Sequence, residues 1–470
     1  MTTTNAAGAG QDHRSDQGLI AVIRSEDATG PRPCEARDVT AIPLRPVVPS
    51  ADRLVGRPGL PGERPGGEHR PLRVLLTTDW WEPVVNGVVA SVATLRRELI
   101  ALGCDVRVLT LSQGLRTRRE PGVYRIGSVS AAMVYDRARI GMPASRRVLR
   151  DILRWRPDVI HSQCEFSTYV WARRIARTLG VPLVHTYHTI YEDYTHYYSP
   201  SRTMGRAVVA SFSRRVLAGT DAVVVPTAKV ARLLSGYGVR RPVHVIPTGL
   251  DLNRFRPAQD AAERADAARL RADLGIAPDT TVLVSVCRLA KEKNLDEVLD
   301  MVAEADRADT VLVIVGDGPY RAELEERAEQ LGITDRVRFT GVVDPGEVQR
   351  WYRIGDVFVS ASLSETQGLT FIEALACGLP LLCRRDPSIA SVVLDGRTGW
   401  QYETAAEFTR HLDALVSDRP ARAAMAAQSV AHAGATCGAR EFGRSVLDVY
   451  QQARARRSPR VLALPARAVA

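Results

Sequence analysis

Short apolar runs alternate with segments of helical period along most of this 470-residue chain. In the first half, the runs that we expect to be strands are 73–79, 105–111, 158–163, 182–188, 222–227 and 243–249. The segments of helical period between them lie near 87–101, 144–155, 167–179 and 205–218. Apolar strands separated by helices indicate a parallel sheet that is covered on both faces.

The same alternation begins again at Thr281. The expected strands of this second half are 281–287, 311–316, 337–340, 357–361 and 380–383. The expected helices are 295–305, 319–331, 345–353 and 369–377. A passage rich in Pro, Arg and Ala separates the halves at about 250–280, and we interpret it as a hinge. The pattern predicts an α/β protein with two doubly wound Rossmann-like domains that face each other across a cleft.

The flanking segments lack such a pattern. Residues 1–70 are rich in Gly, Pro, Arg and Asp, which predicts a disordered leader. We therefore divide the chain into that leader, two domains, a C-terminal helix that packs back on the first domain, and a disordered tail. Their predicted bounds are 1–70, 71–255, 256–438, 439–454 and 455–470.

Charge is distributed unevenly between the two domains. Residues 71–250 hold 26 Arg and Lys against 12 Asp and Glu, whereas residues 251–454 hold 24 against 32. A basic half suits nucleic acid, a membrane surface or an acidic ligand. No nucleic-acid-binding motif is present, so we expect no nucleic-acid partner. The seven cysteines are scattered, and no signal peptide or membrane-spanning run is present. We therefore expect a reduced, cytoplasmic location.

The segment from Ser364 to Ala376 places Glu365 and Glu373 eight positions apart, after an apolar strand. A glycine, Gly368, precedes the helical period, so bare backbone N–H groups and a helix dipole would meet at the turn. Such a turn suits a phosphate, with a carboxylate on either side for sugar hydroxyls. The spacing alone is also met by two solvated glutamates on a surface helix.

Three further clusters follow the carboxyl ends of expected strands, where parallel sheets bind ligands. Asn86-Gly87 would open a helix toward the cleft, although an ordinary Asn-Gly turn fits equally well. The stretch from His185 to Tyr194 gathers imidazole, phenol and carboxylate groups around His188, and it lacks the spacing of a zinc site.

The third cluster holds Arg288 and Lys293, which would neutralise a diphosphate that lies opposite the Glu365–Glu373 turn. A solvated basic turn is the alternative. Gly316-Asp317-Gly318 is a tight turn that would let the backbone approach a ligand.

Taken together, these residues resemble the family 4 glycosyltransferases of the two-domain GT-B fold. The resemblance covers nearly everything from Arg73 to about Tyr450. Its most specific parts are the Arg288/Lys293 pair, the turn at Gly316 and the Glu365–Glu373 segment. Two segments are most similar in sequence to bacterial diacylglycerol glucosyltransferases and relatives that glycosylate lipids. They are HTYHTIYEDYTHYY and SETQGLTFIEALACGLP.

The resemblance implies retaining, metal-independent transfer of a hexose from a nucleoside-diphosphate sugar, UDP-glucose-like, with no cofactor. It places the acceptor on domain 71–255 and the nucleotide sugar on domain 256–438. His188 and Glu365 would act at the reacting sugar. The implied donor-binding residues are Gly87, Arg288, Lys293, Gly316, Gly368, Leu369 and Glu373. The resemblance implies no protein nucleophile, and the departing phosphate would take the acceptor's proton on the same face of the sugar. One departure is Val85-Asn86-Gly87, because many relatives have two adjacent glycines there.

The acceptor is expected to be a membrane lipid such as diacylglycerol. The residues that we expect on the acceptor or membrane side are Arg146, Arg147, Arg150, Tyr191 and Asp193. A basic amphipathic face suits an anionic membrane and peripheral attachment to the inner face of the plasma membrane, and an Arg-rich solvated face is the alternative. Two other functions stay open: a GDP-mannose-dependent mannosyltransferase acting on a phosphoinositide or small soluble acceptor, and a sugar-nucleotide epimerase of the same fold.

Overall fold

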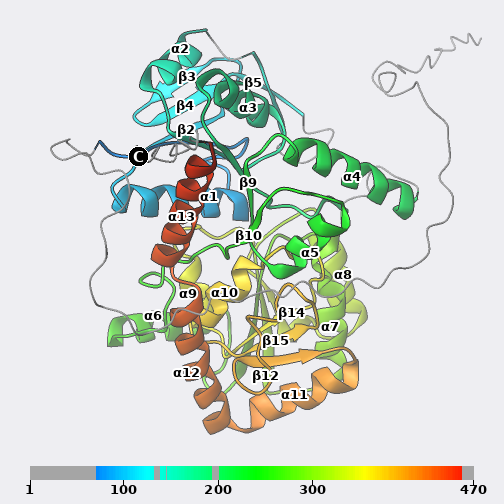
Figure 1. Ribbon diagram of the computed structural model, residues 1–470. Coiled ribbons are helices and arrows are strands. Elements are labelled where there is room, and N and C mark those ends of the chain that lie inside the picture. The colour runs from blue at the N-terminus through cyan, green and yellow to red at the C-terminus, as the bar shows by residue number, and fades with distance from the viewer. Residues whose placement is uncertain (1–69, 132–137, 144–145, 193–200, 458–470) are drawn as a thin grey trace, which may run out of the picture. The chain divides into compact units, whose positions relative to one another are not determined.

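The computed structural model of the protein describes residues 70–131, 138–143, 146–192 and 201–457 (Figure 1). Apart from Arg70, the predicted leader 1–70 lies outside these residues, as does the chain beyond Arg457. The described residues form two Rossmann-like α/β domains, so the predicted fold class is confirmed.

An eight-stranded sheet in the order β10-β9-β8-β7-β1-β2-β4-β3 organises the N-terminal domain. All neighbouring pairs are parallel except β3 and β4. The strands are β1 (Arg73–Thr77), β2 (Asp105–Leu111), β3 (Arg118–Glu120), β4 (Val123–Ile126), β7 (Val159–Ser162), β8 (Leu183–Thr186), β9 (Ala222–Val225) and β10 (Val243–Val245). A separate pair, β5 (Ser128–Ser130) and β6 (Arg139–Gly141), is antiparallel.

Both faces of this sheet are buried, because alternate residues of each strand point to opposite sides. Leu75 of β1 joins a core cluster with α2 (Arg146–Trp155), α3 (Ser167–Leu179), α4 (Arg202–Leu217) and α5 (Ala228–Gly236). Val74 and Leu76 join the opposite cluster with α1 (Gly87–Ala101) and α13 (Ala439–Arg457). Strands buried on both sides explain the nearly continuous apolar runs in the sequence.

A six-stranded parallel sheet in the order β13-β12-β11-β14-β15-β16 organises the C-terminal domain. Its strands are β11 (Thr281–Val286), β12 (Thr310–Val315), β13 (Val337–Phe339), β14 (Val357–Ser360), β15 (Leu381–Arg384) and β16 (Gly399–Tyr402). One face packs on α6 (Ala261–Asp273), α9 (Val348–Arg353), α10 (Leu369–Ala376) and α12 (Arg419–Thr436). The other face packs on α7 (Leu295–Glu304), α8 (Arg321–Gln330) and α11 (Ala405–Ser417).

The final helix returns to the N-terminal domain, where α13 lies against α1 (Figure 1). Phe442 and Val446 of α13 join the core beneath α1. A Cβ added at Gly443 would lie 2.6 Å from Glu98 Cβ, so glycine permits this close helix contact. α13 reaches Arg457, three residues beyond the predicted end at 454.

The passage 250–280, which we interpret as a hinge, contains a helix that the sequence analysis did not predict, α6 at residues 261–273. Ala267, Leu270 and Leu274 pack partly buried against the core of the C-terminal domain. This helix has no fully buried residue, so its sequence shows only a weak apolar stripe.

Candidate active site

The carboxyl ends of the central N-terminal strands meet at one edge of the sheet. Thr77 of β1 is paired with Ser162 of β7, which is paired with His185 of β8. The segments after these strands carry Gly87, Gln163 and His188, so the topology gathers them at the edge where parallel sheets bind ligands.

Two helices begin opposite each other where the domains meet. A Cβ added at Gly87, the first residue of α1, would lie 3.6 Å from Leu369 Cδ1, at the first residue of α10. Asn86 caps α1, because its Oδ1 accepts a hydrogen bond of 2.9 Å from Val89 N. Two helix N-termini here direct N–H groups and positive dipole ends to one place, which suits an anion.

The start of α10 depends on Gly368. Its φ of 72° lies in the left-handed region, and an added Cβ would come within 2.6 Å of the Phe371 ring. Glycine is therefore required both for the backbone angle and for space. As the sequence predicts, Glu365 precedes the helix and Glu373 lies within it.

The donor-site cations are each paired with a carboxylate. Lys293 Nζ lies 2.6 Å from Glu365 Oε1, which also accepts a hydrogen bond of 2.9 Å from Ser362 Oγ. Arg288 Nη2 lies 2.5 Å from Glu292 Oε1. Ser364 Oγ donates to the Glu292 carbonyl at 3.1 Å and so joins the two pairs. The structure thus brings Arg288, Lys293 and Glu365 together, and it adds Glu292, which the sequence analysis missed.

The glycine turn supports the loop that carries Arg288. An added Cβ at Gly316 would overlap the Cys287 carbonyl, and one at Gly318 would overlap the Leu289 carbonyl. Leu289 N also donates to Asp317 O at 3.0 Å. These glycines let two backbone segments lie in direct contact, which fixes Arg288 between them.

Glu373 lies within α10 and is half-buried, as is Glu365 before the helix. Burial raises the pKa of its carboxyl to about 7, although a hydrogen bond from Tyr352 and the charge of Arg254 act in the opposite direction. Tyr352 Oη donates to Glu373 Oε2 at 2.7 Å. A carboxyl group with this pKa changes its charge near neutral pH.

His188 lies beyond β8 and is held by Gln163. The distance between His188 Nε2 and Gln163 Oε1 is 2.8 Å. Burial and the neighbouring His185 lower the pKa of His188 to about 4, although Glu165 acts to raise it. The ring is therefore neutral at pH 7.

Glu165 binds two other side chains near His188 through its two carboxylate oxygens. Its Oε1 lies 3.2 Å from His185 Nε2, and its Oε2 accepts a hydrogen bond of 2.6 Å from Tyr191 Oη. The Tyr191 ring packs edge-on against Phe166 and Phe212. Tyr191 is thus tied to the edge that carries His188, whereas Asp193 lies outside the described residues.

Lys229 of α5 connects the N-terminal domain to the loop before α10. Its Nζ lies 2.9 Å from Asp386 Oδ1, 3.2 Å from the Leu363 carbonyl oxygen and 3.5 Å from the Glu365 carbonyl oxygen. In the same region, Gln367 Oε1 accepts from Thr248 N at 2.9 Å. These contacts join residues more than 100 positions apart, and no local sequence pattern predicts them.

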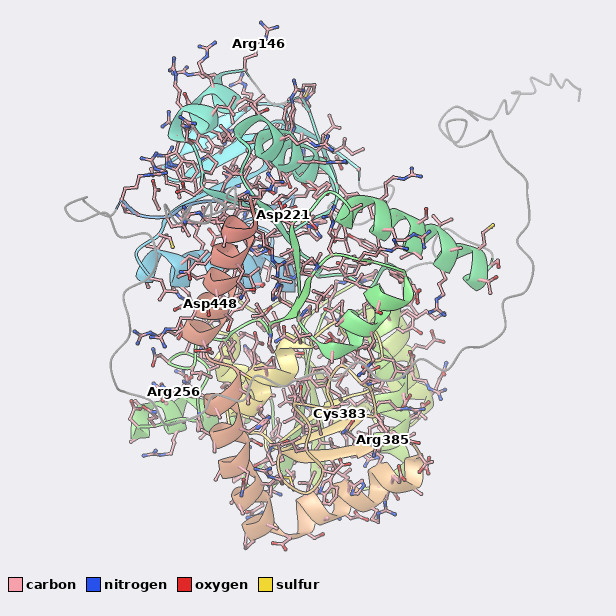
Figure 2. The ribbon with its side chains drawn as sticks, in the orientation of Figure 1. Arg146, Asp221, Arg256, Cys383, Arg385 and Asp448 are labelled. Atoms are coloured by element: carbon pink, nitrogen blue, oxygen red, sulfur yellow. The ribbon has the colours of Figure 1, made fainter. Side chains whose placement is uncertain are left out.

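The arginines of α2 lie elsewhere. Arg146, Arg147 and Arg150 are exposed, and the helix buries Val148 and Ile152 on its other face. Arg146 points outward at the end of the N-terminal domain away from α10 (Figures 1 and 2). The structure therefore does not bring these arginines to the donor site, and their membrane role stays a prediction.

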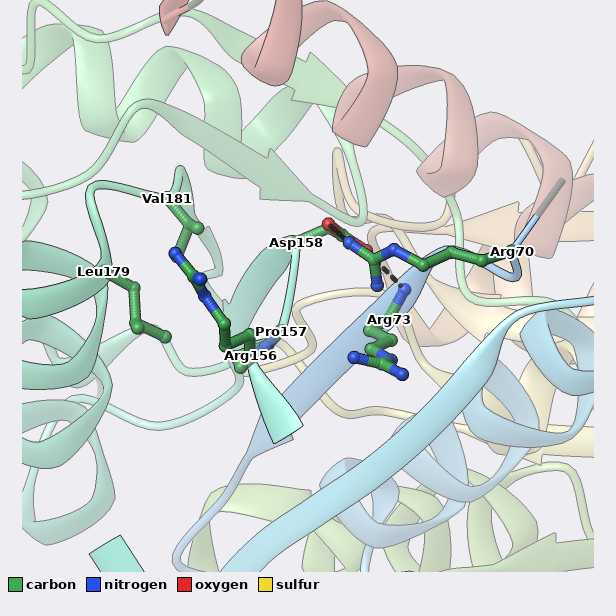
Figure 3. A pocket seen from close by; sticks show the side chains of 7 residues that line it. All are labelled: Arg70, Arg73, Arg156, Pro157, Asp158, Leu179 and Val181. Carbon is green, nitrogen blue, oxygen red and sulfur yellow. Dashed lines mark hydrogen bonds and ion pairs between the residues drawn. The ribbon is translucent and has the colours of Figure 1, made fainter. Parts of the chain in front are cut away.

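A hollow at the opposite edge of the N-terminal sheet is separate from this site (Figure 3). It lies at the amino ends of β1 and β7, where Arg70 Nη2 contacts Asp158 Oδ1 at 2.7 Å and Arg73 N donates to Asp158 Oδ2 at 2.9 Å. The Asp158 carboxylate is thus already paired with Arg70, the arginine that it faces. This edge is not the one at which parallel sheets bind ligands.

Two features are absent from the described residues. No group of three or more His, Cys, Asp or Glu side chains among them has a metal-binding arrangement. No helix in the described ranges combines the length and the apolar character needed to span a bilayer.

Comparisons with known proteins show the family and the fold. Residues 85–254 match the family model Glycosyltransferase Family 4, and residues 266–431 match Glycosyl transferases group 1. The chain is 38% identical over 336 residues to an alpha-monoglucosyldiacylglycerol synthase of Streptococcus pneumoniae, covering 70% of this chain and 75% of that one. It is 32% identical over 401 residues to a D-inositol 3-phosphate glycosyltransferase of Frankia alni, covering 78% and 95%.

A solved structure shares the fold. The crystal structure of Anabaena HepE in complex with UDP and glucose matches with a TM-score of 0.64 at 18% sequence identity, covering 81% of this chain and all of that one. The matched family models cover both Rossmann-like domains. The chain also covers 75% of the length of the Streptococcus pneumoniae relative. The chain therefore belongs to the family 4 glycosyltransferases of the GT-B fold.

Proposed function

We propose that this glycosyltransferase moves a hexose from a nucleoside-diphosphate sugar, UDP-glucose-like, to a hydroxyl of a membrane lipid such as diacylglycerol, with retention of configuration and without a metal ion. The observation that carries the proposal is the meeting of two helix N-termini, at Gly87 and Leu369, beside the Lys293–Glu365 pair. Bare N–H groups, dipole ends and cations converge there on the space of one diphosphate.

The cations change partners when the donor binds. Lys293 and Arg288 turn from Glu365 and Glu292 to the diphosphate oxygens, whose negative charge is greater. Glu365 is then released to accept hydrogen bonds from hydroxyls of the donor sugar. At the other end of the donor, Glu373 accepts hydrogen bonds from the ribose hydroxyls.

Transfer exchanges one bond at the anomeric carbon for another on the same face of the sugar. The bond from this carbon to the diphosphate oxygen breaks, and a bond to the acceptor oxygen forms. The acceptor's proton passes to the departing phosphate oxygen, so no protein base is needed, and the acceptor oxygen itself forms the new bond to the anomeric carbon. Arg288 and Lys293 stabilise the charge that develops on the leaving group, and His188 binds a sugar hydroxyl.

Lipid acceptors are supported by the name of the Streptococcus pneumoniae relative and by the surface of the N-terminal domain. On α4, Met204 and Val208 are 55% and 59% exposed and lie four positions apart, on one face of the helix. Exposed Arg206 belongs to the same helix, and Arg146 and its neighbours on α2 add further cations. Apolar and basic side chains together suit the surface of an anionic membrane.

A second candidate is favoured by the Frankia alni relative, which the chain covers over 95% of its length. In that case the donor would be GDP-mannose or a similar nucleotide sugar, and the acceptor a phosphoinositide or a small soluble inositol phosphate. The basic excess of the N-terminal domain suits a phosphorylated acceptor as well as an anionic membrane.

A donor and acceptor screen tests the proposal. UDP-glucose, UDP-galactose and GDP-mannose are each incubated with diacylglycerol in anionic vesicles and, separately, with D-inositol 3-phosphate. We expect UDP release that requires diacylglycerol, and an α-linked glycolipid by NMR. Transfer only to the inositol phosphate would favour the second candidate. A β-linked product would overturn retention, and no transfer from any of the donors would overturn the proposed reaction.

A further inference from the structure

Gln163 is a buried residue at the candidate active site to which the sequence analysis gave no role. It follows β7 directly, it is 2% exposed, and its backbone N donates to the Thr77 carbonyl at 2.8 Å. The residue is therefore fixed between the carboxyl ends of β1 and β7. Its side chain extends from this fixed position to the segment that follows β8 and reaches His188.

The contact between the two side chains defines which ring nitrogen carries a proton. Gln163 Oε1 lies 2.8 Å from His188 Nε2. An amide oxygen only accepts hydrogen bonds, so His188 Nε2 must donate. A neutral imidazole has a single N–H, and its Nδ1 therefore keeps a lone pair. Among the described residues, the His188 ring makes no other side-chain hydrogen bond.

The stability of the fold does not explain why a glutamine occupies position 163. Its Nε2 is buried and has no hydrogen-bond partner in the described part of the chain. An unsatisfied buried donor costs free energy, and an apolar side chain of similar size would avoid that cost. Among the described residues, His188 is the one side chain to which the Gln163 side chain is hydrogen-bonded, so the benefit that balances this cost lies at His188.

The groups around His188 show why a neutral partner matters. The negative charge of Glu165 favours the protonated ring, whereas burial and His185 oppose it. Glu165 is itself bound by Tyr191 and His185. His161 is also buried and is bound to Tyr450 and Thr186. Gln163 thus holds the ring without adding a second negative charge, which a glutamate at 163 would do.

We propose that Gln163 is a positioning residue, which holds His188 as the neutral Nε2–H tautomer and leaves Nδ1 as a hydrogen-bond acceptor for a hydroxyl of the donor sugar. The role rests on the proposed function, since it supposes that His188 contacts the sugar. It specifies the chemistry of that contact: the sugar hydroxyl donates and the ring accepts.

Two substitutions test the proposal through pH profiles. Gln163→Leu removes the acceptor while keeping a side chain of similar size, and it should lower kcat/KM about tenfold at every pH. Gln163→Glu keeps an acceptor but adds charge, which stabilises the protonated ring. Its kcat/KM should fall at neutral pH and recover as pH rises, because the ring then loses its extra proton. A merely structural role would not produce this recovery.

A spectroscopic measurement tests the tautomer without any turnover. In protein labelled with ¹⁵N-histidine, long-range ¹H–¹⁵N correlations distinguish the two neutral forms, and the spectrum of His188→Ala assigns the signal. We expect the Nε2–H form in wild type at pH 7 and a mixture in Gln163→Leu. An Nδ1–H form in wild type, or wild-type pH profiles for both variants, would overturn the inference. Failure of wild type to transfer any sugar would instead reject the proposed function.

Discussion

Lys293 and Glu365 neutralise each other in the donor site, with Nζ and Oε1 only 2.6 Å apart. Arg288 and Glu292 repeat the arrangement at 2.5 Å. Both cations that we assign to the diphosphate are therefore paired with carboxylates in the protein without substrate. Donor binding is then an exchange of partners, and its free energy depends on what each cation gives up.

Replacing Glu292 should tighten nucleotide binding. In Glu292→Gln the attraction that holds Arg288 away from the diphosphate is weaker, so the Kd for UDP should fall about threefold to tenfold. Isothermal titration calorimetry measures it. Glu325→Gln is the matched control, since Glu325 also pairs with an arginine four positions away, Arg321 Nε, at 2.7 Å. Weaker UDP binding in Glu292→Gln would instead mean that Glu292 holds Arg288 in its binding position.

Removal of the Lys293 charge should abolish most transfer. Lys293→Ala removes one of the two cations assigned to the leaving phosphate, with Arg288 the other, and should lower kcat/KM by about 100-fold or more. The matched control is Lys291→Ala, because Lys291 is exposed two positions away and should be dispensable. UDP release measures activity, and thermal melting checks folding. Equal activity of the two variants would reject the role assigned to Lys293.

Glu365→Ala should be similarly inactive, for a different reason. The carboxylate is expected to bind donor-sugar hydroxyls, and its loss should reduce kcat more than it weakens UDP binding, because UDP carries no sugar at that position. Kinetics with the donor and calorimetry with UDP separate these two effects. A proportional loss of UDP affinity would move Glu365 to the nucleotide end of the site.

The parallel sheets were predictable from the sequence, and so was the position of several candidate site residues at the ends of strands. Strands buried on both faces give long apolar runs, and their carboxyl ends bring Gly87, His188 and Glu365 to the sheet edges. Contacts across long stretches of chain were not predictable. Lys229 reaches the Glu365 carbonyl from 136 positions away, and Gln163 reaches His188 from a different strand. Such pairs depend on how loops are placed in three dimensions, and a lone Lys or Gln carries no local signal.

Short or exposed elements were missed for a related reason. α6 buries no residue fully, so its Ala- and Arg-rich sequence lacks the apolar stripe by which helices are recognised. β3, β5 and β6 have only three residues each, and every residue of β3 is exposed. Alternation of apolar and polar positions needs a longer segment before it becomes distinctive.

Glu373 should make nucleotide binding depend on pH. Its pKa is raised to about 7, and only the ionised carboxylate would accept hydrogen bonds from both ribose hydroxyls, as we propose that it does. UDP affinity should therefore rise as pH increases through 7 and then level off. Glu373→Gln should bind UDP more weakly and without this pH dependence. Calorimetry between pH 5.5 and 8.5 tests both statements, and a pH-independent wild type would contradict the role of Glu373.

The same carboxyl group should lower stability at high pH. Its pKa in the folded protein, about 7, exceeds the ordinary value of 4.5, so folding favours the protonated form. Stability is then lost as pH rises from 4.5 through 7. Glu373→Gln should raise Tm at pH 8 and leave it nearly unchanged at pH 4.5. An equal change in Tm at both pH values would show that the effect arises from packing and not from ionisation.

Loss of Lys229 should loosen the loop before α10. Lys229→Ala removes the ion pair with Asp386 and the contacts to the Leu363 and Glu365 carbonyls, so hydrogen exchange in residues 362–367 should quicken. Because this loop carries Glu365, kcat/KM should fall about tenfold. Arg232→Ala is the control, since Arg232 is exposed on the same helix. Unchanged exchange in Lys229→Ala would show that the loop is held by Gln367 and its neighbours instead.

The arginines of α2 should bind the protein to anionic vesicles. Each arginine near such a surface contributes about 1 kcal/mol, so replacing Arg146, Arg147 and Arg150 by alanine should weaken vesicle binding by about 100-fold. A control variant replaces three exposed arginines of the acidic domain, Arg264, Arg269 and Arg410. Co-sedimentation with phosphatidylglycerol vesicles should separate the two variants at low salt and fail to do so at high salt, because ions screen the attraction. Equal binding of both variants at low salt would assign membrane contact to another surface, with α4 and its exposed Met204 and Val208 the next to be tested.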